Sequence, residues 1–227
     1  QASTTLNYED RHQKLAGALS EHNLNAIVLN PGPSLPYFTG LGFHLSERPV
    51  VVIFGIDQAP IMVLPELEAL KLENLAYEIQ AFTYGEDPKT WVKAFKAAIK
   101  AGGFEQGKIG VEPRALRVLE LDLLQEAAPK AEFVSGEKGI AALRMLKDEN
   151  EVASMREAAK IALSALRSTF PYISSGRTEK EIAAELVMHL LRHGSNPHLP
   201  FSPIVSGGPN SANPHACANP SAFRLSN

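Results

Sequence analysis

Residues 200–215 read PFSPIVSGGPNSANPH, and this stretch is the most informative in the chain about how it folds. An apolar run over residues 201–205 leads into the turn-forming residues 206–210. Glycine lets the backbone pass close to another group, and Pro214 fixes φ and so limits where His215 can point. We therefore predict a strand that delivers His215 to a site.

The overall composition excludes several classes of protein. The chain has 227 residues, 44% hydrophobic and 21% charged, so it can bury the core of one large or two small domains. Its net charge of -3, with basic and acidic residues interleaved, argues against a nucleic-acid partner. No apolar run approaches the ~20 residues that cross a bilayer, so no membrane partner is expected. A single cysteine, Cys217, excludes an internal disulfide and favours the cytoplasm.

The first part of the chain alternates between helical and strand patterns. Helical periodicity is found over residues 9–23, 89–101 and 113–127, and strand-like runs over residues 26–29, 49–54, 60–64, 77–82, 108–111 and 131–134. The second and third of these runs are joined by a short turn, which predicts a hairpin. Together the patterns predict a layered α/β domain with a mixed sheet flanked by helices.

The second part of the chain is dominated by long helices. Residues 147–170 carry apolar side chains at helical spacing. Residues 178–181 (TEKE) form a capping box that opens a second helix, which ends near His193. The change in character predicts two domains, residues 1–138 and 139–227.

Several motifs occur in an order that is typical of one family. In the first part they are LPYFTG at residues 35–40, ERP at 47–49 and PELE at 65–68. In the second part they are Lys147, Glu149, Glu151, Met155, Arg156, Ala158 and Ala159, then Gly176, Thr178, Glu179 and residues 181–183, and finally residues 200–215. Their order and spacing resemble the creatinase and Xaa-Pro peptidase family (pita-bread metallopeptidases, M24) over nearly the whole chain.

The resemblance implies an α/β creatinase-like N-terminal domain followed by an incomplete α+β pita-bread domain. Active members of the family hold two divalent metal ions, manganese, cobalt or zinc, bound by two aspartates, a histidine and two glutamates. A bridging hydroxide attacks the carbonyl of the peptide bond before proline. In the family all five ligands follow the motif that ends at His215, so this chain is expected to be a fragment without metal ligands.

A physical argument independent of the family also favours a fragment. The helices predicted over residues 147–170 and 178–193 each have an apolar face. Few residues follow to cover these faces, and exposed apolar surface is costly. The leading hypothesis is a metal-dependent Xaa-Pro aminopeptidase or dipeptidase, inactive as this chain, acting on proline-containing peptides as a homodimer. The alternatives are a non-catalytic peptide- or protein-binding module of the same fold and a creatinase-like amidine hydrolase.

His215 is the predicted site residue. It matches the family position that lines the substrate cleft and stabilises the reaction intermediate, so we predict a catalytic and substrate-binding role in the full-length protein. His189 and His193 lie four residues apart on a helix, a spacing that can hold zinc. Because Leu190 stands where zinc peptidases carry a glutamate, ordinary boundary residues are the favoured interpretation.

Other polar residues are predicted to be solvated. His44 and Arg48 follow the LPYFTG segment, where a role in substrate access competes with a favoured solvent-exposed loop. Cys217 lies two residues after His215, a spacing that suggests a nucleophile pair but rarely gives its geometry. Glu66 and Glu68 are predicted to be solvated or helix-starting carboxylates.

Overall fold

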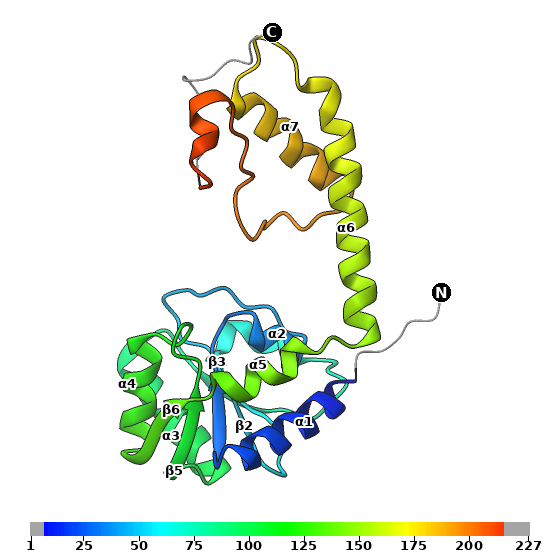
Figure 1. Ribbon diagram of the computed structural model, residues 1–227. Coiled ribbons are helices and arrows are strands. Elements are labelled where there is room, and N and C mark those ends of the chain that lie inside the picture. The colour runs from blue at the N-terminus through cyan, green and yellow to red at the C-terminus, as the bar shows by residue number, and fades with distance from the viewer. Residues whose placement is uncertain (1–6, 216–227) are drawn as a thin grey trace. The chain divides into compact units, whose positions relative to one another are not determined.

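The structure is a computed structural model and describes residues 7–215 (Figure 1). The chain splits into two compact units, Gln1–Leu146 (unit 1) and Lys147–Asn227 (unit 2). This division lies after the domain boundary placed at residue 138 from the sequence. The difference is helix α5 (Glu137–Met145), whose Ile140 is 3% exposed and belongs to a hydrophobic core of unit 1.

Unit 1 is built on a mixed sheet of strand order β4-β3-β2-β1-β5-β6 (Figure 1). The strands are β1 (Ala26–Leu29), β2 (Val51–Gly55), β3 (Ile61–Pro65), β4 (Gln80–Tyr84), β5 (Gln106–Val111) and β6 (Lys130–Ser135). Strand β2 pairs antiparallel with both β1 and β3, while the other neighbours are parallel. The hairpin and the mixed sheet predicted from the sequence are therefore confirmed.

Helices cover both faces of this sheet, because alternate residues of each strand point to opposite sides. One core joins Val28, Ile53 and Val63 to helices α3 (Pro88–Gly102) and α4 (Val118–Ala127). The other core gathers strand residues from the opposite face with helices α1 (Tyr8–Glu21), α2 (Ser34–Thr39) and α5. The 3-10 helix η1 (Glu66–Leu72) is the remaining element of the unit.

Unit 2 consists, in its described part, of two helices and their connecting segments. Helix α6 (Glu149–Thr169) packs against α7 (Glu179–Arg192). The 3-10 helix η2 (Phe170–Tyr172) follows α6, and the 3-10 helix η3 (Gly208–Ala212) comes after α7. Among the described residues no helix combines the length and apolar character needed to cross a membrane.

The strand predicted between residues 200 and 206 is absent, and that prediction is wrong. The segment between α7 and η3 has no regular secondary structure. Pro200 and Pro203 lack the N–H that a ladder needs, and no described strand of unit 2 offers a partner. An extended run with apolar side chains therefore stays irregular unless another strand pairs with it.

Candidate active-site loop

A buried carboxylate at the start of α7 holds the loop that leads to His215. Glu179 is 4% exposed although it is charged. Its Oε1 accepts a hydrogen bond from the backbone N–H of Gly207 at 2.7 Å, and its Oε2 accepts one from Nδ2 of Asn210 at 2.8 Å. Hydrogen bonds to charged groups contribute about 1.5–3 kcal/mol each, so the two contacts fix this loop against the helix.

The predicted capping box places this carboxylate. The hydroxyl of Thr178 accepts a hydrogen bond from the N–H of Glu181 at 3.2 Å, while Oε2 of Glu181 accepts one from the N–H of Thr178 at 2.8 Å. Glu179 takes no part in the box and is the first helical residue, where the positive end of the helix dipole favours a negative charge. Its side chain is thus available for the loop.

Sequence reasoning placed Glu179 in the capping motif but missed its contact with the loop. The sequence does contain a feature that could have indicated this contact. The first turn of α7 carries two acidic residues, and only Glu181 is needed for the capping box, so Glu179 can bind another group. A Gly-Gly run with an asparagine nearby offers the donors that such a residue needs. The signal is weak, because 28 residues separate Glu179 from Gly207.

His215 lies at the end of this loop and is exposed. Its backbone N–H donates to Oδ1 of Asn213 at 3.0 Å, which closes a tight Asx turn around Pro214. The asparagine turn therefore holds the main chain at His215, and Glu179 holds the preceding part of the loop at Gly207 and Asn210. These contacts determine where the main chain places His215. The chemical role of its side chain stays a prediction.

The same tripeptide occurs a second time in unit 2. Residues 196–198 are also Asn-Pro-His, and the N–H of His198 donates to Oδ1 of Asn196 at 2.9 Å. Both histidines are exposed. The local turn is thus common to both sites, and what distinguishes His215 is the neighbouring loop held by Glu179.

His189 lies in the last turn of α7, and His193 is the C-cap of this helix. Nδ1 of His193 lies 2.8 Å from the carbonyl oxygen of His189, and their rings are 6.3 Å apart. His189 is 9% exposed and its ring lies 5.6 Å from that of Tyr172. Within the described ranges no group of three or more His, Cys, Asp or Glu side chains could hold a metal ion.

In unit 1 the polar residues noted in the sequence lie at the surface. Arg48 bonds Oε2 of Glu86 at 2.7 Å and Oε1 of Glu47 at 2.8 Å. The hydrogen bond to Glu86 raises the pKa of the Arg48 guanidinium, which keeps its charge. His44 is exposed in the same loop.

Of the remaining predicted residues, the structure describes Glu66 and Glu68. Glu66 and Glu68 both lie in the first turn of η1, and Glu68 pairs with Lys71 at 2.7 Å. They are therefore helix-starting carboxylates, one of the two interpretations predicted. Cys217 lies outside the described residues.

Comparison with known proteins identifies the family. The family model of the Creatinase/Prolidase N-terminal domain matches residues 11–146, and that of Metallopeptidase family M24 matches residues 153–225. The chain belongs to the creatinase/prolidase family, with the creatinase-type N-terminal domain followed by part of an M24 domain. The predicted family and fold class, including the pita-bread assignment of the second domain, are confirmed.

The related proteins are longer than this chain. YkvY of Bacillus subtilis (strain 168) is 26% identical over 216 residues, which are 95% of this chain and 58% of that protein. The Xaa-Pro dipeptidase of Lactobacillus delbrueckii subsp. lactis is 25% identical over 203 residues, 89% of this chain and 55% of that protein. The chain thus spans a little over half the length of these relatives.

Solved structures give the same result for the fold. A dipeptidase from Pyrococcus horikoshii OT3 has a TM-score of 0.82 at 26% identity, covering 94% of this chain and 58% of the other. A recombinant prolidase from Thermococcus sibiricus has a TM-score of 0.83 at 23% identity, covering 95% of this chain and 58% of the other. The second likeness supports the fold only.

Proposed function

We propose that this chain is part of a metal-dependent Xaa-Pro peptidase that hydrolyses the peptide bond before proline. The main support is that the two family models match the chain one after the other, the N-terminal domain first and the M24 domain second. The loop between Glu179 and His215 lies inside the M24 match. The relatives named as dipeptidase and Xaa-Pro dipeptidase support a dipeptidase more than an aminopeptidase.

In such an enzyme two divalent metal ions, manganese, cobalt or zinc, supply a hydroxide nucleophile and polarise the scissile carbonyl. The described residues do not fit this group, because they contain no cluster of three or more ligating side chains. No step through the metals follows from them, and we place the ligands outside the described residues.

The role we assign to this part of the chain is the placement of His215. Glu179 fixes the loop at Gly207 and Asn210, and the Asn213 turn fixes the main chain at His215, which carries the exposed imidazole. A positioned imidazole N–H can donate to the oxyanion that forms on the attacked carbonyl. Preorganisation of this kind costs no rearrangement during the reaction.

We further propose a cytoplasmic homodimer. The single cysteine of the chain fits a reducing compartment. Exposed apolar side chains in unit 2, such as Phe201 at 71% and Ile204 at 50%, favour association with further protein. Sedimentation analysis of the protein purified from its source cells tests the dimer, and a monomer at micromolar concentration contradicts it.

The first experiment is the intact mass of the natural polypeptide, followed by an assay. We expect a mass above 24.6 kDa by about one further domain. Ala-Pro should be hydrolysed by the natural protein after EDTA treatment and addition of Mn²⁺, and Ala-Ala should not. Comparing Ala-Pro with Ala-Pro-Ala separates a dipeptidase from an aminopeptidase. A natural mass of 24.6 kDa, or no cleavage with Mn²⁺, Co²⁺ or Zn²⁺, overturns the proposal.

A pair of histidine variants tests the role of His215. In the natural protein, His215→Ala should lower kcat for Ala-Pro by about 100-fold or more. His198→Ala removes a histidine from the same kind of turn and should leave kcat within about twofold of the parent. Equal loss in both variants contradicts a specific role for His215, while the peptidase proposal stands on the parent activity.

A further inference from the structure

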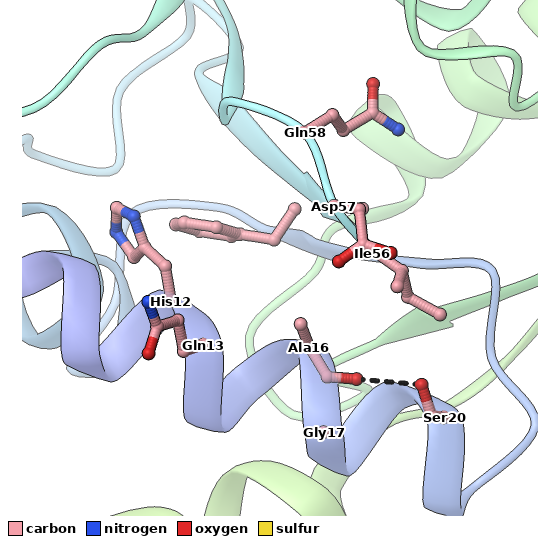
Figure 2. Close-up of a pocket in the computed structure, with 10 residues that line it drawn as sticks. His12, Gln13, Ala16, Gly17, Ser20, Ile56, Asp57 and Gln58 are labelled. Atoms are coloured by element: carbon pink, nitrogen blue, oxygen red, sulfur yellow. Dashed lines mark hydrogen bonds between the residues drawn. The ribbon is translucent and has the colours of Figure 1, made fainter.

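Unit 1 contains a pocket that the proposed peptidase chemistry does not use. It lies between helix α1 and the turn after β2 and has a volume of about 430 Å³ (Figure 2). Figure 2 shows His12, Gly17 and Ser20 along the helix, with Asp57 and Gln58 in the turn that faces them. A volume of this size is within the range of small-molecule sites.

The helix side of the pocket carries a glycine without a packing reason. Gly17 lies inside α1, where glycine weakens a helix relative to alanine. A Cβ built at Gly17 would meet nothing within 4 Å, so no neighbour requires the missing side chain. The glycine leaves the helix backbone open to the pocket, and a ligand can approach it closely.

His12 presents a hydrogen-bond acceptor on a rigid ring. Nε2 of His12 lies 2.7 Å from the carbonyl oxygen of Phe38, which can only accept, so Nε2 carries the proton. Burial lowers the pKa of His12, which favours the neutral ring with Nδ1 as an acceptor. The centroid of this ring lies 5.1 Å from that of Phe54 and 4.9 Å from that of Tyr77, and these two contacts restrict its orientation.

Ser20 and Gln58 also leave acceptors for a ligand, and Gln13 adds a further side-chain amide to the lining. The Ser20 hydroxyl donates to the carbonyl of Ala16 at 3.1 Å, and Nε2 of Gln58 donates to the carbonyl of Gly102 at 3.2 Å. The Ser20 donor and one of the two Gln58 N–H donors are thus used within the protein, while the oxygens of both side chains can still accept. Asp57 adds a carboxylate and is the one charged residue of the lining.

Because Asp57 is the one charged residue of the lining, the complementary ligand is a cation with a short apolar part. We propose that this pocket binds a small organic ammonium ion. Its N–H groups donate to the Asp57 carboxylate. Its alkyl part rests over Gly17 and against the ring of Phe54, whose face also attracts a cation.

The test is a titration of the ¹⁵N-labelled 227-residue chain with n-butylammonium, followed through its backbone amides. We expect saturable shifts centred on Gly17 and Gly55. The neutral 1-butanol has a similar shape but lacks the charge, and it should bind about fivefold more weakly or not at all. Gly17→Leu fills the pocket from the helix side and should abolish the shifts.

Two further variants complete the test, one that removes the charge of the pocket and one that serves as a control. Asp57→Asn lies in an exposed turn at a φ of 57°, which asparagine tolerates, and it should weaken n-butylammonium about fivefold. Gly85→Leu adds the same side chain at another open glycine of unit 1 and should leave binding unchanged. Shifts that rise linearly, that 1-butanol reproduces, or that persist in Gly17→Leu and Asp57→Asn mean an adventitious amine only and overturn the proposal. The binding does not depend on the peptidase proposal.

Discussion

Unit 1 and the described part of unit 2 are stabilised in different ways. Unit 1 buries apolar side chains on both faces of its sheet, and the large side chains that are fully buried, such as Phe38 and Phe95, belong to it. Among the described residues of unit 2, three of the five buried ones are polar. The five are Ala165, Thr169, Glu179, Ile182 and His189. Packing thus fixes unit 1, whereas hydrogen bonds of buried polar groups fix the loop of unit 2.

The surfaces of the two units show the same contrast. Helices α6 and α7 and residues 194–204 line an apolar groove of about 650 Å³ within unit 2. Phe201 and Leu166 on its border are 71% and 40% exposed. Apolar surface of this kind marks a place where further protein packs. Unit 1 therefore buries its own apolar surface, whereas unit 2 offers apolar surface for additional contacts.

The largest expected effect tests the packing of unit 1. Phe95 is 0% exposed, so Phe95→Ala should lower the free energy of unfolding of unit 1 by about 3–5 kcal/mol. Urea unfolding followed by the fluorescence of Trp91, the chain's single tryptophan and a neighbour in the same core, measures it.

The matched substitution is Phe201→Ala in unit 2. Because Phe201 is 71% exposed, its loss should change the free energy of unfolding, followed by circular dichroism, by less than about 0.5 kcal/mol. A large loss in this variant would show that Phe201 is buried in solution. The contrast between the units would then fail.

The second prediction tests whether polar contacts hold the loop of unit 2. Glu179→Ala removes the acceptor of two hydrogen bonds, and the loop around Gly207 should lose about 2–3 kcal/mol of local stability. Hydrogen exchange of the Gly207 amide should therefore accelerate about 30-fold or more. Glu157→Ala, at an exposed ion pair with Lys160 on α6, is the control and should leave that exchange rate unchanged. Equal exchange in both variants would refute the contact.

The smallest expected effect is a pH dependence confined to unit 1. Burial lowers the pKa of His12, and its hydrogen bond to Phe38 only partly opposes this. The unfolded chain therefore binds a proton more readily, so this contribution is fully present above the unfolded pKa of about 6.5 and is lost as the pH falls below it. His12→Gln should flatten the decline of unit 1 stability between pH 7 and pH 5. His22→Gln, at the exposed end of the same helix, should retain it.

Local sequence patterns predicted the elements that local interactions create. The strand at residues 26–29 and the hairpin of β2 and β3 follow from short apolar runs bounded by turn residues. The start of α7 follows from its capping box, whose reciprocal bonds involve residues three apart. These elements could be predicted because every group that forms them is near in the chain.

Elements that depend on distant partners were missed or placed wrongly. Helix α2 contains Pro36 and ends at Gly40, so its sequence reads as a turn, although Leu35 and Phe38 are drawn into a core. Residues 201–205 have the composition of a strand, yet the described part of unit 2 contains no strand to pair with them. Composition cannot supply the partner that a strand needs.

The sequence by itself determined the family, the two-part organisation and the identity of His215 as the residue to test, because the motifs are contiguous and ordered. The tertiary structure decided which groups hold that histidine's loop and where the pocket of unit 1 lies. Glu179 meets Gly207 across 28 residues, and α1 meets the turn at Asp57 through the packing of unit 1. Contacts of this kind arise from folding in three dimensions, and the spacing of residues along the chain does not encode them visibly.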